Sequence, residues 1–344
     1  MIEDCLGQCA INAANISFNL EGLRSGFWEL TIDGLAWGAI YALVAVGYTL
    51  VFGVLRLINF AHSEIFMLGM FGAYFTLEMV LGFTPSGNAY SMGIFLTVAY
   101  LGIAMLVAMV VSGTAAMGLE AVAYRPLRKR NAKPLAFLIT AIGMSFVLQE
   151  FVHFVLPQLV RGYGGSNAQQ PIVLVVPKTQ FTVFGATVSN VMLVIVAAAC
   201  FFALVVDRAI NRTKFGRGIR AVAQDPTTAT LMGVSRERII ILTFLIGGLL
   251  AGAAALVSLA WLGSGRPNIG QNLELTSLTA ATLGGVSIFG GKGGVAGVLA
   301  AVLLLVTLQT ALLQLNVNSI WQVGIVGILL IIVLLIDRLS TPRR

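Results

Sequence analysis

The sequence predicts an all-α integral membrane protein, a polytopic bundle of about nine spanning helices in which some helices are broken or re-entrant. Of its 344 residues, 58% are hydrophobic and only 10% are charged, whereas soluble domains carry roughly 25% charged residues. The apolar residues form long continuous runs without the alternation of a strand, and a helix of ~20 such residues crosses a bilayer. Because only helices and closed barrels satisfy their backbone groups in lipid, these runs predict helices.

Nine candidate spans follow one another along a single transmembrane domain, residues 31–338. In order they are Leu35–Leu55, Ile58–Leu81, Met92–Met117, Leu135–Leu156, Val188–Val206, Ile239–Leu262, Leu273–Phe289, Val295–Leu315 and Ser319–Ile336. The second carries a polar cluster, and the seventh is short and rich in Gly and Thr. These two are therefore the weakest candidates, and a re-entrant segment among them would change the sidedness of the N-terminus.

Lys and Arg residues gather in three segments, Arg125–Lys133, Arg208–Arg238 and Arg338–Arg344. Cytoplasmic loops collect these residues, so the three segments are expected to face the cytoplasm. No aromatic residues alternate with the basic ones, which excludes a stacking platform for nucleic acid. The formal net charge of +7 therefore reflects membrane topology.

With nine spans, the acidic tail at residues 1–30 is expected to lie outside the cytoplasm. It lacks the pattern of a signal peptide.

The polar segment 207–238 between two spans is expected to be folded. Asp225 is a good N-cap, Pro226 suits the first helical position, and Gly233 suits the residue after the helix end. These signals predict a short cytoplasmic helix, Pro226–Met232, on which Thr228, Leu231 and Met232 share one face. That face either packs on the protein's own span ends or docks into a partner subunit.

The glycine-rich segment Thr282–Gly297 does not fit a phosphate-binding loop. Lys292 is followed by Gly293, where a phosphate loop needs Ser or Thr. Glycines between two membrane helices more often mark a tight turn or a close helix contact. Any ATP chemistry is therefore expected from a partner subunit. The three cysteines, Cys5, Cys9 and Cys200, form no metal or redox pattern, and no metal site or catalytic group is predicted.

A polar cluster lies inside the second apolar run, where "INFAHSEIFMLG" contains Asn59, His62, Ser63 and Glu64. On a regular helix the first three share one face, while Glu64 points elsewhere and cannot pair simply with His62. Two readings stay open. These side chains hold the start of a broken helix by bonding freed backbone groups, or they line a translocation path.

The fourth span carries a second polar pair. Ser145 and Gln149 are four residues apart and share one helix face. They are taken together with the first cluster as candidates for a gate or a translocation path.

Several stretches resemble the permease subunit of branched-chain amino acid ABC importers. They are "GAIYALVAVGYTLVFGVLRLINFAHSEIFMLGMF", "VAYRPLRKR", "LITAIGMSFVLQ", "GRGIRAVAQDPTTATLMGVSRERIIILTFLIGGLLAG" and "LGGVSIFGGKGGVAGVLAAVLLL", in the family's order between Gly38 and Leu315. The most specific is INFAH followed by Glu64, although the family usually has Gly where Ser63 stands. The family's coupling helix corresponds to Pro226–Met232, so the resemblance implies that this helix contacts an ATPase.

The resemblance implies an ABC importer permease fold with no cofactor of its own. A second, related permease would complete the pore, two cytoplasmic ATPases would supply ATP and Mg²⁺, and a periplasmic binding protein would deliver substrate. The expected function is import of branched-chain or related small amino acids across the bacterial inner (plasma) membrane. Permeases for urea, short amides or other small organic acids are alternatives. An ion-coupled secondary transporter is a further one and would use membrane-embedded carboxylates such as Glu64, Glu78 or Glu150.

Overall fold

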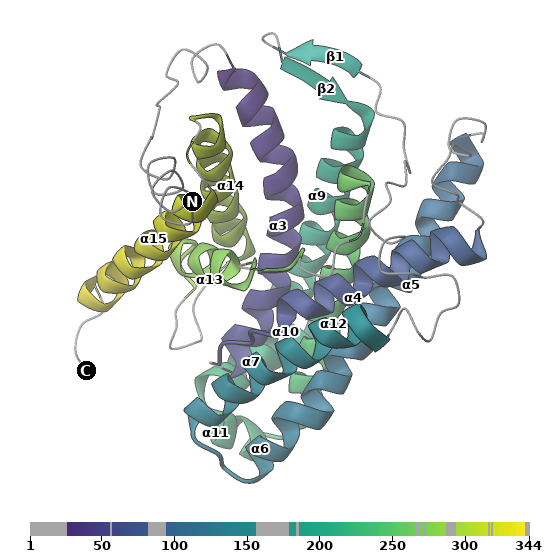
Figure 1. Ribbon diagram of the computed structural model, residues 1–344. Helices are drawn as coiled ribbons and strands as arrows, with labels where there is room; N and C mark the ends of the chain where they lie inside the picture. The colour runs from purple at the N-terminus through teal and green to yellow at the C-terminus, as the bar shows by residue number, and fades with distance from the viewer. Residues whose placement is uncertain are drawn as a thin grey trace, which may run out of the picture.

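The computed structural model of the protein describes residues 26–55, 57–81, 94–155, 179–183, 186–263, 265, 269–271, 273–286, 294–315, 317 and 319–340. Nearly all of these residues lie in helices (Figure 1). Most of the predicted tail at residues 1–30, including Cys5 and Cys9, lies outside the described residues.

The described part of the chain runs through helices, three π-helical turns and one hairpin. In chain order the elements are α3 (Phe27–Leu55), α4 (His62–Phe75), η1 (Thr76–Val80), α5 (Ile94–Leu119), η3 (Glu120–Tyr124), α6 (Arg125–Lys129), α7 (Pro134–Glu150), η4 (Phe151–Val155), β1 (Thr179–Val183), β2 (Ala186–Ser189), α9 (Asn190–Arg212), α10 (Lys214–Gln224), α11 (Pro226–Leu231), α12 (Arg236–Leu262), α13 (Leu273–Leu283), α14 (Val295–Gln314) and α15 (Ser319–Ser340).

Six helical stretches of the described chain are long and apolar enough to cross a membrane, so the expected count of about nine is not confirmed. They are Phe27–Leu55, Leu96–Lys129, Pro134–Phe154, Asn190–Arg212, Arg236–Leu262 and Val295–Gln314. Helix α15 contributes a shorter apolar stretch, Trp321–Val333. The chain is a multi-pass helical membrane protein.

The two weakest candidate spans differ most from the expectation. The second was expected to start at Ile58, but α4 begins only at His62. The seventh was expected to reach Phe289, but α13 has 11 residues and ends at Leu283. At 1.5 Å per residue such a helix is about 16 Å long, roughly half of the ~30 Å hydrocarbon core. Helix α13 therefore cannot span alone, which fits the expected broken or re-entrant helices.

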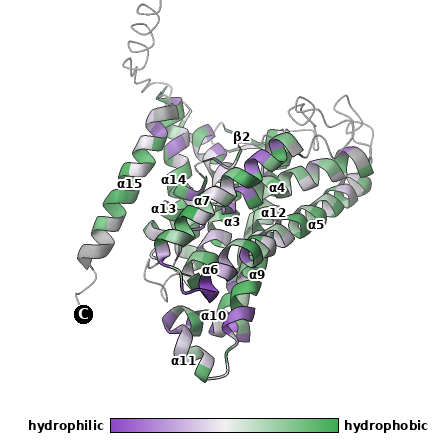
Figure 2. Cartoon of the chain, turned by 60° about the horizontal axis from the view of Figure 1, so that its bottom comes forward, coloured by the Kyte–Doolittle hydropathy of each residue, from purple (hydrophilic) through white to green (hydrophobic). Residues whose placement is uncertain are grey.

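Helices α3 and α12 form the inner part of the bundle. In the apolar window of α3, 78% of residues are buried, and in that of α12 67%, against 17% for α7. Helix α3 packs against α12, α13 and α14, and α12 also packs against α4 and α5 (Figure 1). The outer helices α5, α7 and α9 are mainly hydrophobic (Figure 2). Large apolar side chains on them, such as Leu106, Phe146 and Phe201, are exposed where lipid can cover them.

Glycines let α12 approach its neighbours closely. A Cβ on Gly247 would lie 3.0 Å from the Gly47 carbonyl oxygen of α3, and one on Gly252 would lie 2.4 Å from the Ala108 carbonyl oxygen of α5. The distance at Gly252 is shorter than real Cβ contacts, and the one at Gly247 would require the facing backbone to shift. Small residues at such crossings allow the tight packing on which helix association in lipid depends.

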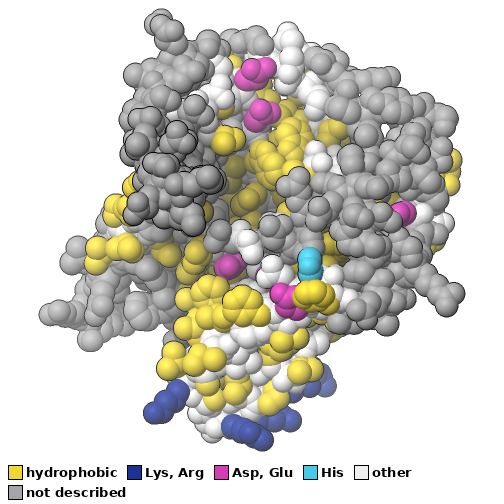
Figure 3. Space-filling view, viewed as in Figure 1, with side chains coloured by type: hydrophobic (Ala, Val, Ile, Leu, Met, Phe, Trp, Pro, Cys, Tyr) yellow, Lys and Arg dark blue, Asp and Glu magenta, His cyan; other side chains and the backbone are white. Residues whose placement is uncertain are grey.

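The two ends of the molecule differ in polarity. Before α9 the chain forms an antiparallel hairpin, β1–β2, in which Val183 pairs with Ala186, and this hairpin was not predicted. It lies at the opposite end from α6 and α11 (Figure 1). Lys and Arg side chains gather at the end formed by α6, α10 and α11 (Figure 3), where the hydrophilic residues are also concentrated (Figure 2). The basic residues of the first two segments used to predict the cytoplasmic side thus lie together, and those of Arg338–Arg344 are outside the described side chains.

Candidate functional site

A break between α3 and α4 builds the centre of the candidate site. Helix α3 ends at Leu55 and α4 starts at His62, so Asn59 lies in the connection. Its side-chain oxygen accepts hydrogen bonds from the Ala61 backbone N–H at 3.2 Å and from the Tyr124 hydroxyl at 2.8 Å. Asn59 therefore satisfies a backbone group freed by the break, as the structural reading of this cluster requires. The helix face expected to join Asn59 to His62 and Ser63 does not form, because the helix begins after Asn59.

Glu64 joins residues from two distant segments. Its side chain lies in the first turn of α4 and is only 5% exposed. One carboxylate oxygen accepts hydrogen bonds from the Ser145 hydroxyl of α7 at 2.9 Å and from the Ser63 hydroxyl at 3.4 Å. The predicted group of Ser63, Glu64 and Ser145 is thus brought together. The position of Glu64 is favourable because the N-terminal end of a helix carries partial positive charge.

His62 turns away from Glu64, as its spacing predicts. The ring of His62 is buried and packs edge-on against Tyr48 of α3, with 5.9 Å between ring centroids. A Cβ on Gly47 would come within 3.3 Å of its Nε2 atom. His62 therefore fills the space between α3 and α4.

Gln149 does not join the cluster. It is half-buried one turn beyond Ser145, and in the described part of the chain it makes no hydrogen bond with the cluster. A role for Gln149 in a gate or translocation path stays a prediction from the sequence. Glu150 is exposed at the end of α7.

Glu274 was missed as a site residue. It lies in the first turn of α13, and its carboxylate interacts electrostatically with Glu64 and lies close to the Ser63 hydroxyl. The chain before α13 touches the start of α4, since a Cβ on Gly270 would lie 2.8 Å from the Ser63 carbonyl oxygen. The two helix starts therefore meet inside the protein. The only feature of the sequence that could have indicated it is that Glu274 is a lone acidic residue at the edge of an apolar run.

A second buried carboxylate lies at the basic end of the molecule. Glu120 is fully buried in η3 and accepts hydrogen bonds from Arg125 at 2.6 Å and from Arg128 at 2.7 Å. Arg128 also contacts Glu237, in the first turn of α12, at 2.6 Å. This ion cluster, Glu120–Arg125–Arg128–Glu237, fastens the α5–α7 connection to the start of α12. No local pattern in the sequence predicted it.

Helix α11 has the caps that the sequence predicts. Asp225 accepts hydrogen bonds from the backbone N–H groups of Thr227 at 2.8 Å and Thr228 at 3.2 Å, and from the Thr228 hydroxyl. The hydroxyl of Thr228 and these N–H groups stabilise the carboxylate and hold the pKa of Asp225 below its usual value. The helix begins at Pro226 as expected, and Gly233 adopts φ +85°, which a glycine tolerates best.

The face of α11 that carries its large apolar side chains is open. Leu231 is 82% exposed and Met232 81%, while Ala229 is buried against the protein. Thr228 is exposed as well. The packing of α11 on its own spans therefore uses the Ala229 side, and the Thr228–Leu231–Met232 face stays uncovered within the described chain.

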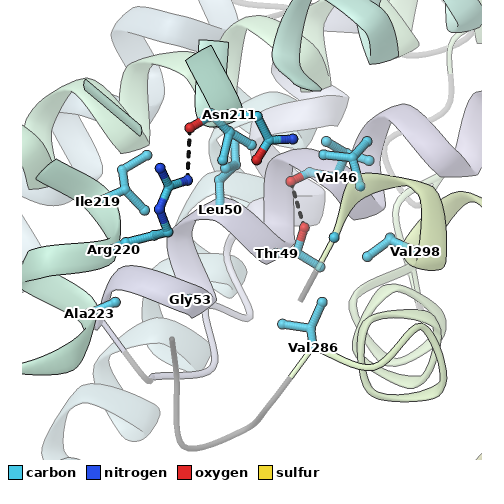
Figure 4. Close-up of a pocket in the computed structure, with 13 residues that line it drawn as sticks. Val46, Thr49, Leu50, Gly53, Asn211, Ile219, Arg220, Ala223, Val286 and Val298 are labelled. Carbon is cyan, nitrogen blue, oxygen red and sulfur yellow. Dashed lines mark hydrogen bonds between the residues drawn. The ribbon is translucent and has the colours of Figure 1, made fainter. Parts of the chain in front are cut away.

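A cavity of about 170 Å³ lies between α3, the end of α9, α10 and the start of α14 (Figure 4). Its walls are mainly apolar, with Thr49, Asn211 and Arg220 as polar members. The Arg220 guanidinium donates a hydrogen bond to the Ile210 carbonyl oxygen at 3.0 Å, and the Thr49 hydroxyl donates one to Val46 at 2.8 Å (Figure 4). Arg220 thus secures the last turn of α9, where a cation is favourable.

Residues 30–334 match a family model described as the permease component of the branched-chain amino acid transport system. This chain belongs to that family. It is a membrane-embedded permease of an ABC transport system, and its family consists of transporter components rather than enzymes. The match covers all the described helices from α4 to α14 and most of α3 and α15.

The permease is similar to curated relatives over most of its length. High-affinity branched-chain amino acid transport system permease protein LivH of Escherichia coli (strain K12) is 31% identical over 269 residues, or 76% of this chain and 79% of that protein. BraD of Pseudomonas aeruginosa, with the same description, is 31% identical over 269 residues, or 76% and 80%. The fructose import permease protein FrcC of Rhizobium meliloti is 34% identical over 129 residues, 38% and 36% of the two chains. No solved structure matches the chain.

Proposed function

We propose that this permease moves branched-chain or related small amino acids into the cytoplasm as one subunit of an ABC importer in a bacterial inner membrane. The observation that carries the proposal is the similarity to LivH and BraD over about three quarters of the chain, with the fructose permease matching a much shorter stretch. The buried region around Glu64 also contains few charged groups, which suits a substrate with an apolar side chain.

The partners follow from the same proposal. Two cytoplasmic ATPases hold ATP and Mg²⁺ and bind the exposed face of α11. A second permease, either a copy of this chain or a relative, completes the translocation path, and a periplasmic binding protein delivers substrate. The capped helix with two exposed apolar side chains at the basic end supports the ATPase contact, because an isolated helix shorter than ~12–15 residues is not stable without packing.

Uptake by the complete complex tests the function. The permease is reconstituted in proteoliposomes with the two ATPases, the second permease and the binding protein of its transport system. Uptake of leucine, isoleucine and valine is compared with that of urea, acetamide, fructose and xylose. We expect ATP-dependent uptake of the branched-chain amino acids only. Uptake of urea or a short amide in their place would assign the alternative substrate class, and sugar uptake would assign the class of the fructose relative. Uptake driven by an ion gradient without ATP would contradict the importer reading.

A further inference from the structure

The region where α4 and α13 begin contains more hydrogen-bond acceptors than donors. Glu64 and Glu274 are acceptor-only groups when ionised, with two oxygens each. Two hydroxyls are already engaged with them: that of Ser145 donates to Glu64, and the single proton of Ser63 faces Glu64, Glu274 and the Phe60 carbonyl oxygen. One proton cannot serve three acceptors, so the two carboxylates keep unused acceptor capacity.

Several buried polar atoms beside these carboxylates have no partner. Among the described residues, one carboxylate oxygen of Glu274 and the hydroxyl of Ser277 are buried without a hydrogen bond. Ser277 is three positions after Glu274 and therefore shares its face of α13. The hydroxyl of Tyr48, which interacts electrostatically with Glu274, is also buried and unpaired. Buried polar groups are nearly always paired in folded proteins, so these atoms call for a partner beyond the described residues, and a bound ligand is a partner of that kind.

No cation of the described chain balances the two carboxylates. The ion pairs formed by its Lys and Arg residues lie at the basic end, on Glu120 and Glu237. The N-terminal ends of α4 and α13 each favour one negative charge. They do not remove the repulsion between the two carboxylates, and they leave the Glu274 oxygen without a donor. A ligand that carries positive charge and several N–H donors would satisfy both needs.

We propose that Glu64 and Glu274, with the hydroxyls of Ser63, Ser145 and Ser277, bind the α-ammonium group of the amino acid during its passage. An ammonium group supplies one positive charge and three donors to acceptors that the structure leaves open. The substrate carboxylate is repelled from the same place, so the subsite orients the zwitterion. This inference rests on the proposed amino acid substrate and adds the residues that recognise its charged end.

Ligand-induced stabilisation of the purified complex tests the chemistry directly, because a ligand that binds the native state raises its melting temperature. The probes share one branched carbon skeleton: leucine, 3-methylbutylamine, which lacks the carboxylate, and 4-methylpentanoate, which lacks the ammonium group. At millimolar concentration we expect leucine and the amine to raise the apparent melting temperature and the carboxylate not to. An equal rise with the carboxylate, or no rise with the amine, would overturn the proposal. So would an equal rise with sodium chloride, which would show a general cation site.

Glutamine variants connect this binding to transport. Glu64→Gln and Glu274→Gln remove the charge while keeping size and hydrogen-bonding atoms, and Glu150→Gln is the control because Glu150 is exposed on α7 outside the cluster. We expect uptake of leucine by the complete complex to fall about tenfold or more in the first two variants, the typical effect of losing a charge-assisted hydrogen bond. They should also lose the stabilisation by 3-methylbutylamine, while Glu150→Gln keeps both.

The outcomes separate the subsite from the function. If the wild-type complex takes up no amino acid, the proposed function fails. If it does, and both cluster variants match Glu150→Gln in uptake and in amine binding, the carboxylates only complement the helix ends and the subsite is wrong. Should a glutamine variant not accumulate as folded protein, the comparison of amine with carboxylate on the wild-type complex decides alone.

Discussion

The ion cluster at the basic end allows a sharp prediction about stability. Arg128 is 7% exposed and contacts Glu120, which is fully buried, whereas Glu237 is 52% exposed. Removing one partner of a buried ion pair costs about 3–5 kcal/mol, because the other charge stays buried without compensation. An exposed pair is worth about 0.2–1 kcal/mol. Arg128→Ala should therefore lower the free energy of unfolding several times more than Glu237→Gln does.

The measurement is equilibrium unfolding of the purified permease in mixed micelles, followed by tryptophan fluorescence during titration with a denaturing detergent. Arg128→Lys serves as the matched variant. It keeps the charge but loses the planar fork that reaches Glu120 and Glu237 together, so its cost should lie between the other two. If Arg128→Ala and Glu237→Gln destabilise the protein equally, the burial argument is wrong. Arg125 would then compensate Glu120 without help from Arg128.

Three further predictions concern coupling, packing and the gate. Leu231→Asp should abolish co-purification of the ATPases while the permease still inserts, because it places a charge on the exposed apolar face of α11. Asp225→Ala removes only the N-cap and should weaken co-purification less. Normal ATP-driven transport by the Leu231→Asp variant would exclude α11 as the coupling helix. Gly252→Ala should destabilise the protein by about 1–3 kcal/mol in the same unfolding assay, because the new Cβ would meet the α5 backbone. Gly143→Ala is the control: no atom lies near its Cβ, so it should be neutral or slightly stabilising. His62→Ala should reduce the yield of folded protein together with transport, and a normal yield with altered substrate preference would instead support a role in lining the path.

Local signals in the sequence predicted local structure well. Asp225, Pro226 and Gly233 define the ends of α11 because capping depends on residues within one turn of the helix end. The described Lys and Arg side chains also lie together at one end of the molecule (Figure 3), and that this end faces the cytoplasm stays a prediction. The ends of α4 and α13 were less accessible. Apolar residues continue past both helices, and hydropathy alone does not show where the chain turns back.

Contacts between distant segments could not be predicted. Ser145 and Glu64 are 81 residues apart, and Arg128 and Glu237 are 109 apart, so neither pairing leaves a trace in local spacing. Glu120 follows a long apolar helix directly before the basic residues, where a glutamate is ordinarily a solvated surface group. Arg125 and Arg128 lie on the continuation of the same helical stretch, but the burial of Glu120 also depends on the packing of α7 against η3, which local spacing does not specify.

Buried carboxylates nevertheless give a rule for a sequence as apolar as this one. Each must find donors, since an unpaired charge in a low-dielectric interior is strongly unfavourable, so each predicts partners even where it does not identify them. Glu120 is paired with two arginines, which donate to both of its carboxylate oxygens. Glu64 is only partly satisfied, because two serine hydroxyls donate to one of its oxygens. For Glu274 the described chain leaves a buried oxygen unpaired. By the rule that accounts for the first two carboxylates, the third needs a donor beyond the described residues, and the proposed substrate ammonium group passing between α4 and α13 is a donor of the right charge.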